Sequence, residues 1–195
     1  MKDARRILIA LGSPRRSGSS ALLAQQAAQG AVEAGARCET ICLHQMHIKP
    51  CCACDHCQTS PGRACLLKDD MQKLYPKLLT ADALIMAGPV YWFTVSAQTK
   101  LFMDRWYALA RPGGHSLKGK RVGIILTYGD ADPYASGAVN AIRTFQDAFR
   151  YIGAPIAGVV YGTGNDPRAV KKDKRLMRAA LELGKRLAQD RKSVV

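Results

Sequence analysis

The sequence has no uninterrupted apolar run of about 18 residues, the length that a membrane-spanning helix needs. Its first residues, MKDARRILIALGSPRR, contain an apolar stretch that is too short for a secretory signal and is soon broken by Pro14 and two arginines. We therefore expect a cytoplasmic protein with no membrane partner. In such a reducing compartment, a dense group of cysteines more often binds a metal or does redox chemistry than forms disulfides.

Acidic residues are scarce, with 15 Asp and Glu against 29 Lys and Arg, so the net charge is +14. This excess indicates an anionic partner: a phosphorylated cofactor, an acidic protein or nucleic acid. The sequence contains no helix-turn-helix or RNA-binding signature, and basic faces on soluble helices are usually just solvated. Nucleic acid is therefore not an expected partner, and a non-enzymatic basic binding module is the least favoured function.

Short apolar runs alternate with longer helical patterns along the chain. With 195 residues and 48% hydrophobic content, the chain can build one sizeable core, and we expect a single domain over 1–195. Five strands and five helices in strict alternation predict an α/β fold with a doubly wound parallel sheet covered on both faces. The expected strands are 6–13, 37–43, 81–92, 120–129 and 155–162, and the expected helices are 19–34, 69–80, 96–110, 134–153 and 167–190.

The loop after the first expected strand, GSPRRSGSS (12–20), is rich in hydrogen-bond donors. It directly precedes a helix, whose N-terminal amides and dipole attract anions. The lysine of an ATP-binding P-loop and the G-x-G-x-x-G fingerprint are both absent, and hydroxyls dominate the loop. The pattern favours a terminal phosphomonoester over a dinucleotide pyrophosphate. The alternative is a polar capped turn with solvated arginines.

Two further strand ends could complete the same crevice, because ligands of doubly wound sheets bind at the carboxyl ends of the strands. GPVYW (88–92) offers flat apolar surface from Tyr91 and Trp92 that could cover a planar heterocycle. Two aromatics after a buried strand can equally finish a core or an interface. TYGDADPYASG (127–137) is polar, contains glycine, and could form another wall.

Five of the 7 cysteines lie within CCACDHCQTSPGRAC (51–65). Cys51, Cys54, Cys57 and Cys65 have the spacing C-x2-C-x2-C-x7-C, and compact strings of this kind wrap three corners of a [4Fe-4S] cube that a fourth cysteine closes. Zinc sites usually draw two C-x2-C pairs from separate loops. The pattern predicts an iron–sulfur cluster, with zinc or free thiols as alternatives and Cys52 as an alternative first ligand. The two remaining cysteines, in 37–43, are interpreted as small core residues.

Through three of these segments, the chain resembles the iron-sulfur flavoproteins of the NADPH-dependent FMN reductase (flavodoxin-like) superfamily. GSPRRSGSS is similar to the phosphate loop of that family, IKPCCACDHCQTSPGRACLLKDDM to its cysteine segment, and GPVYWFTVSAQTKLFMDRW to its flavin-ring loop and the following helix. The resemblance implies a flavodoxin-like sheet of strand order 2-1-3-4-5, with a cysteine-rich excursion at about 44–68 after the second strand. It also implies homodimers or homotetramers.

The resemblance implies FMN at the carboxyl edge of the sheet. Its phosphate would lie on Ser13, Arg15, Ser17, Ser19 and Ser20, and its ring against Pro89, Val90, Tyr91 and Trp92, with Tyr128 and Gly129 closing one side. The flavin would carry the chemistry, so no catalytic side chain is expected. The leading function is electron transfer between a [4Fe-4S] cluster and FMN, with NAD(P)H or an acidic ferredoxin-like protein as the donor. The alternative is a cluster-free NAD(P)H-dependent FMN or quinone reductase.

Overall fold

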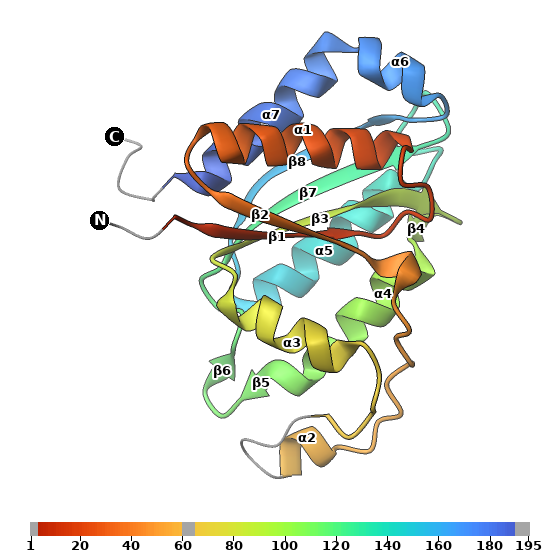
Figure 1. The fold of residues 1–195 in the computed structure, drawn as a ribbon. Coiled ribbons are helices and arrows are strands. Elements are labelled where there is room, and N and C mark those ends of the chain that lie inside the picture. Colours follow the sequence, from red (N-terminus) through yellow and green to blue (C-terminus); the bar gives the residue numbers. More distant parts are fainter. Residues whose placement is uncertain (1–3, 60–64, 190–195) are drawn as a thin grey trace.

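The central sheet sets the architecture of the computed structural model, which describes residues 4–59 and 65–189. Its parallel strands are β1 (Arg6–Leu11), β2 (Arg37–Cys42), β3 (Ala83–Tyr91), β7 (Arg121–Tyr128) and β8 (Ile156–Thr163). They are ordered β2-β1-β3-β7-β8, which confirms the predicted flavodoxin-like order (Figure 1). Short β4 (Thr94–Val95) pairs antiparallel with the end of β3.

Helices cover both faces of this sheet (Figure 1). One face carries α1 (Ser19–Glu33) and α7 (Lys174–Ala188), and the other carries α3 (Met71–Thr80), α4 (Ala97–Asp104) and α5 (Ala138–Ile152). Successive side chains of a strand point to opposite faces, so Ile7 and Ile9 of β1 join the core under α1 and α7, while Leu8 joins the core under the other helices. The apolar runs read from the sequence are therefore buried on both faces.

Two glycines let α1 and α7 pack backbone against backbone. A Cβ atom on Gly184 would lie 1.8 Å from the carbonyl oxygen of Ala27, and one on Gly30 would lie 2.1 Å from that of Leu181. Neither position has room for a side chain. The contact matters for the site, because α1 begins at the expected phosphate loop.

Three predicted helices differ from the structure. The single helix expected over 167–190 is two helices, α6 (Pro167–Lys172) and α7, because the Asp173 side chain accepts a hydrogen bond from the Leu176 amide (2.9 Å) and starts a new helix. The helix expected over 96–110 changes at Arg105 into the 3-10 turn η2 (Arg105–Leu109). The helix expected over 134–153 begins only at Ala138, after left-handed Gly137. A hairpin of β5 (Ala110–Arg111) and β6 (Gly114–His115) was not predicted.

The segment that carries most of the cysteines leaves the sheet after β2. It begins with the 3-10 turn η1 (Leu43–Gln45), continues without regular structure to α2 (His56–Thr59), and reaches α3 after Asp70. Its two ends are joined at His47 and Asp70: the His47 amide donates to the Asp70 carboxylate (2.8 Å) and the Asp70 amide to the His47 carbonyl (3.1 Å). Residues 60–64 lie outside the described ranges. No helix in those ranges is long and apolar enough to cross a membrane.

Candidate functional site

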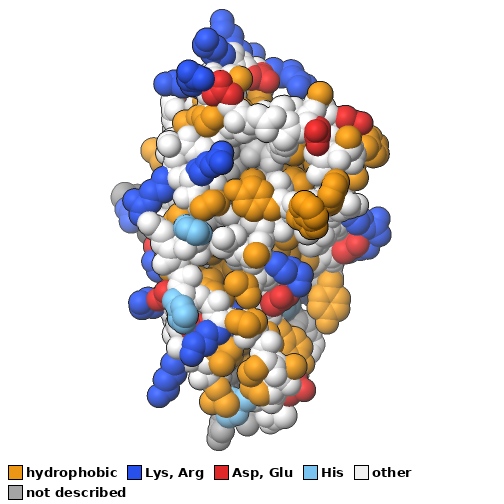
Figure 2. Space-filling model, turned by 90° about the vertical axis from the view of Figure 1, so that its right-hand side faces the viewer, with side chains coloured by type: hydrophobic (Ala, Val, Ile, Leu, Met, Phe, Trp, Pro, Cys, Tyr) orange, Lys and Arg blue, Asp and Glu red, His pale blue; other side chains and the backbone are white. Residues whose placement is uncertain are grey.

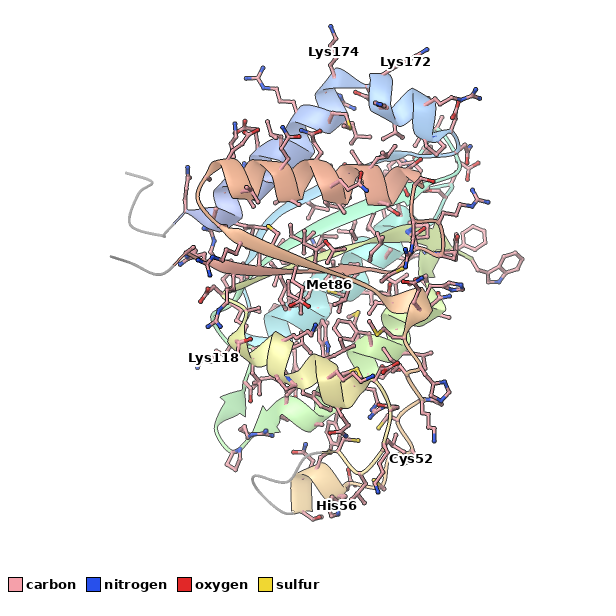
Figure 3. All side chains as sticks on the ribbon, in the orientation of Figure 1. Cys52, His56, Met86, Lys118, Lys172 and Lys174 are labelled. Atoms are coloured by element: carbon pink, nitrogen blue, oxygen red, sulfur yellow. The ribbon has the colours of Figure 1, made fainter. Side chains whose placement is uncertain are left out.

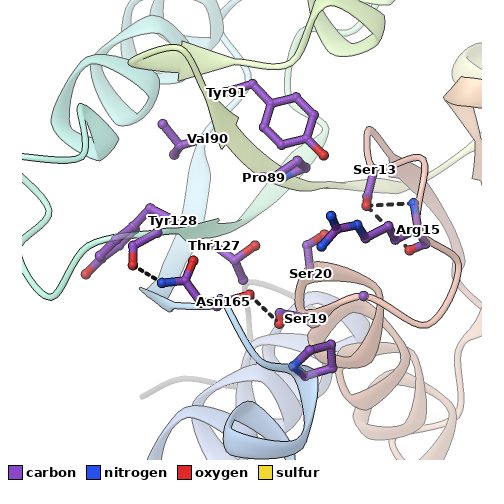
Figure 4. Close-up of a pocket in the computed structure, with 14 residues that line it drawn as sticks. Ser13, Arg15, Ser19, Ser20, Pro89, Val90, Tyr91, Thr127, Tyr128 and Asn165 are labelled. Carbon is purple, nitrogen blue, oxygen red and sulfur yellow. Dashed lines mark hydrogen bonds between the residues drawn. The ribbon is translucent and has the colours of Figure 1, made fainter.

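The carboxyl ends of four strands meet at a pocket of about 220 Å³ (Figure 4). This is the edge at which doubly wound sheets bind their ligands. Its wall combines the loop after β1, the end of β3, the end of β7 and the loop after β8. The lining residues are Ser13, Arg15, Gly18, Ser19, Ser20, Pro89, Val90, Tyr91, Thr127, Tyr128, Gly129, Gly164, Asn165 and Pro167.

The loop after β1 folds back on itself before α1 begins. The buried Ser13 hydroxyl accepts a hydrogen bond from the Arg15 amide (3.1 Å), and the Gly18 amide donates to the Arg15 carbonyl (3.1 Å). Gly18 is the N-cap of α1, and among the described residues no side chain caps its first turn. The first amides of α1 are therefore available to an anion, which the helix dipole also attracts.

Close packing fixes this loop against its neighbours. A Cβ atom on Gly12 would lie 2.0 Å from the Thr99 hydroxyl, and the buried Ser96 hydroxyl, the N-cap of α4, donates to the Gly12 carbonyl (2.8 Å). On the other side, the Ser19 hydroxyl donates to the Gly164 carbonyl (2.7 Å). The start of α1 is therefore joined both to α4 and to the loop after β8, and the donors around the pocket are held in place before any ligand binds.

The opposite wall is flatter and more apolar. Pro89, Val90 and Tyr91 end β3, and Figure 4 shows the Arg15 side chain directed into the space between them and the start of α1. Tyr128 is buried, and this burial, together with the nearby Tyr161 and Asp132, raises the pKa of its phenol. The Tyr128 phenol therefore stays neutral near neutral pH. The wall can cover a planar ring whose edge meets hydrogen-bonding groups.

Nine of the eleven residues predicted to bind the cofactor line this pocket, and Ser17 and Trp92 do not. Ser17 is exposed on the outside of the loop. Trp92 is 91% exposed, because Trp92 and Phe93 both adopt left-handed φ angles (48° and 67°) in the tight turn between β3 and β4. The two rings meet edge to face with their centroids 6.0 Å apart.

The wall built by the loop after β8 was not predicted from the sequence. Gly164, Asn165 and Pro167 line the pocket together with Thr127 of β7. The Gly164 amide donates to the Tyr128 carbonyl (2.8 Å), and Asn165 donates to the Gly129 carbonyl. The signal was present, because GTGNDP follows the last strand just as polar, glycine-bearing stretches follow the others.

The five cysteines of the cysteine segment differ in exposure: Cys51, Cys52 and Cys54 are exposed, whereas Cys57 and Cys65 are half-buried against the core. Thiols are the ligands that iron–sulfur clusters require, so the chemistry of this donor set fits a cluster. Within 4–59 and 65–189, however, no three Cys, His, Asp or Glu side chains are arranged to hold a metal ion.

The half-buried Cys38 and Cys42 of β2 lie apart from this segment. Cys38 packs against the core beneath α1, and its burial raises the pKa of its thiol. Its thiol is therefore a poor ligand in this position.

A buried ion pair lies directly beneath the cysteine segment. The Arg105 guanidinium is 1% exposed, the Asp69 carboxylate is fully buried, and the two groups form a bidentate contact. Burial raises the pKa of Asp69, but hydrogen bonds from Arg105 and from the Lys49 and Met71 amides outweigh it and hold this pKa below its usual value. Burial likewise lowers the pKa of Arg105, but Asp69 and neighbouring groups leave it raised overall. Both groups therefore stay charged.

Basic and hydrophobic side chains occupy different parts of the surface around the pocket. Figure 2 shows this face, with Lys and Arg crowded at the top over α6 and α7 and hydrophobic side chains in the middle and lower parts. Figure 3 shows Lys172 and Lys174 at that upper end and Cys52 and His56 at the lower end. The cysteine segment therefore lies on the opposite side of the sheet edge from the basic helices.

Known proteins match the chain over most of its length. The family model described as NADPH-dependent FMN reductase matches residues 5–166. The putative NAD(P)H-dependent FMN-containing oxidoreductase YwqN of Bacillus subtilis is 30% identical, covering 93% of this chain and 97% of its own. An iron-sulfur flavoprotein of Archaeoglobus fulgidus is 32% identical, covering 91% of this chain and 93% of its own. Among solved structures, an NAD(P)H:quinone oxidoreductase from Methanothermobacter marburgensis shares the fold, with a TM-score of 0.75, 18% identity, and coverage of 96% of this chain and 99% of its own.

Proposed function

Because the chain belongs to the NADPH-dependent FMN reductase family, we propose that its strand-end pocket binds FMN and that its cysteine segment holds a [4Fe-4S] cluster with which the flavin exchanges electrons. The chain is a flavin-dependent oxidoreductase. The observation that carries the assignment of the pocket is its pairing of an uncapped helix start with a flat apolar wall. A cofactor with a terminal phosphate and a planar ring matches both parts.

The phosphate end of the pocket is supported by charge and by available donors. The Arg15 guanidinium supplies the positive charge, and the first amides of α1 and the hydroxyls of Ser13 and Ser20 supply hydrogen bonds. The Ser19 hydroxyl lines the same end and donates its proton to the Gly164 carbonyl, so it holds the start of α1 against the loop after β8. Charge-assisted hydrogen bonds to a phosphate are shorter and stronger than neutral ones. The role of this end of the pocket is to anchor and orient the cofactor, because no reacting group lies on a phosphate.

The ring end of the pocket is supported by Pro89, Val90 and Tyr91 on one side and by Tyr128 and Gly129 on another. FMN, when bound, supplies both one-electron and two-electron redox chemistry. The side chains have to position the ring, limit its contact with water and leave one edge open to a donor or acceptor. None of them has to act as a nucleophile or a general base.

The proposed electron donors are NAD(P)H and an acidic ferredoxin-like protein. The net charge of +14 supports both, since each donor carries negative charge. We also propose that the chain forms a homodimer or homotetramer. The strongly exposed Trp92 and the half-exposed Phe93 beside the pocket are candidates for that contact.

The cluster is supported by spacing, by backbone conformation and by the relatives. Cys51, Cys54, Cys57 and Cys65 are its proposed ligands. Ala53 and Asp55, which lie between them, have left-handed φ angles of 51° and 53°. Successive amides in such turns form concave anion sites that occur at many iron–sulfur centres. Several relatives at about 30% identity are named iron-sulfur flavoproteins.

The second candidate is a cluster-free NAD(P)H-dependent FMN or quinone reductase. It is favoured by the open arrangement of the thiols, since no three potential ligands converge within the described residues. The visible spectrum of anaerobically purified protein separates the two candidates. Flavin bands on a broad shoulder at about 400 nm would support the cluster, whereas flavin bands alone would support the second candidate. A colourless protein that takes up no added FMN would contradict both candidates.

A further inference from the structure

We infer that Arg105 is a positioning residue for the iron–sulfur centre: its guanidinium joins the two ends of the cysteine segment and presents a pair of N–H donors to the sulfur atoms. This inference rests on the proposed function, because it requires a metal centre on that segment. It concerns a residue outside the cysteine motif, on η2, forty positions beyond Cys65.

The first observation is that the Arg105 guanidinium contacts both ends of the cysteine segment. Arg105 Nη1 donates to the Lys49 carbonyl (2.9 Å), just before the first cysteine, and both Nη atoms contact the Asp69 carboxylate, just after the last. Asp69 also accepts hydrogen bonds from the Lys49 amide (2.9 Å) and the Met71 amide (3.0 Å). One buried ion pair therefore holds both ends of the segment to the core.

The second observation is the edge of the guanidinium that faces sulfur. Arg105 Nη2 lies 3.3 Å from the Cys65 Sγ, within hydrogen-bond range. The Arg105 Nε atom is also buried, and it has no partner in the described part of the chain. Because a guanidinium is planar, Nε–H and one N–H of Nη2 leave the group side by side from the same edge. A buried donor without a protein partner is uncommon, and a redox role or a bound ion is among its accepted explanations.

These two donors give Arg105 a chemical role beyond holding the two ends of the cysteine segment in place. Hydrogen bonds to the sulfur atoms of a cluster are among the factors that set its reduction potential, because they stabilise the more negative, reduced state. Lysine keeps the charge and can still pair with Asp69, but it cannot reproduce two parallel N–H groups. Arg105→Lys therefore removes the donor edge while it keeps a cation in the buried site.

The test compares Arg105→Lys with Gln72→Ala in the FMN-loaded full chain after anaerobic cluster reconstitution. Gln72 is the matched control, because its side chain donates to the Cys65 and Leu67 carbonyls (2.8 and 2.9 Å) and so fixes the same end of the segment without contacting sulfur. In competition with a chelator, Arg105→Lys should hold iron about 10- to 100-fold more weakly than the wild type, the usual effect of losing an outer-shell partner on metal affinity. Any cluster that it retains should have a lower reduction potential, whereas Gln72→Ala should keep the wild-type potential.

The inference is overturned if Arg105→Lys matches the wild type in both readouts, or if Gln72→Ala shifts the potential as far. Wild-type protein that takes up no iron would instead refute the proposed cluster itself, and this inference with it. If Arg105→Lys does not fold, as judged by loss of FMN and of near-UV circular dichroism, wild-type protein labelled with ¹⁵N only in arginine decides the question. Its reduced cluster should show a ¹⁵N hyperfine coupling, and the absence of any arginine coupling would refute the role.

Discussion

Replacing Arg15 by alanine should weaken FMN binding without unfolding the protein. Figure 4 shows the Arg15 side chain directed into the pocket, where it supplies the only cation among the lining residues of the described chain. A hydrogen bond to a charged group contributes about 1.5–3 kcal/mol, and the exposure of Arg15 favours the lower part of that range. A loss of about 1.5–2 kcal/mol corresponds to a dissociation constant raised about 10- to 30-fold.

Adding Ser19→Ala should enlarge the effect. The Ser19 hydroxyl donates to the Gly164 carbonyl, so its removal both takes a hydroxyl from the pocket and frees the loop after β8. A neutral hydrogen bond contributes about 0.5–1.5 kcal/mol, which brings the double variant to about 2–3.5 kcal/mol, or about 30- to 300-fold in affinity.

The assay is a fluorescence titration of apoprotein with FMN and, separately, with riboflavin, which lacks the phosphate. Arg15→Ala should weaken FMN binding and leave riboflavin binding unchanged. Arg16→Ala is the matched control, because Arg16 is the next residue, is also exposed, and hydrogen-bonds Gln45 instead of lining the pocket. Equal losses for FMN and riboflavin, or an Arg16→Ala effect as large as that of Arg15→Ala, would refute the phosphate site.

Three further results are expected. Tyr91→Ala should change the flavin absorbance or potential more than Trp92→Ala, because Tyr91 lines the pocket and Trp92 is 91% exposed, and a larger effect of Trp92→Ala would place the ring elsewhere. Asp69→Asn should lower the free energy of unfolding by about 3–5 kcal/mol at pH 7, because it leaves Arg105 unpaired. Since the folded pKa of Asp69 lies below its usual 3.8, the wild type keeps this stabilisation above about pH 4 and loses it as the pH falls through the lowered value. Urea unfolding should therefore show the difference between the two proteins shrinking as the pH falls below 3.8, the usual pKa of the carboxyl, and a constant difference would contradict the assignment. Gly184→Ala should lower the free energy of unfolding by about 1–3 kcal/mol or more in the same assay, because its methyl group would lie 1.8 Å from a backbone oxygen of α1; unchanged stability would mean that α1 and α7 can separate at no cost.

The sheet and the donor-rich loop after β1 could be predicted because their signals are local. Apolar runs such as 6–13 indicate buried strands, and GSPRRSGSS places donors directly before a helix. Once the strands alternate with helices, chain topology brings their carboxyl ends to one edge, so residues as distant as Ser13 and Tyr128 could be assigned to one pocket.

The features that no sequence pattern indicates depend on the backbone angles of one turn, on a single capping hydrogen bond or on a contact between distant segments. Whether Trp92 faces the pocket or solvent depends on the φ angles of a two-residue turn, and large side chains seldom adopt the left-handed values found there. The helix break at Asp173 depends on one capping hydrogen bond within a continuous amphipathic pattern. The contact of Arg105 with Cys65 joins positions forty residues apart, and no local pattern of the sequence indicates it.

The most direct measurement of the proposed function is the content of FMN, iron and acid-labile sulfide per chain after anaerobic purification or reconstitution. Iron and sulfide should approach about four each, the content of one cube, with FMN bound. Cys57→Ser or Cys65→Ser should abolish both while FMN stays bound, and Cys52→Ser should leave iron nearly unchanged. Stoichiometric zinc, or no metal with all 7 thiols titratable, would contradict the cluster and leave the plain FMN reductase in its place.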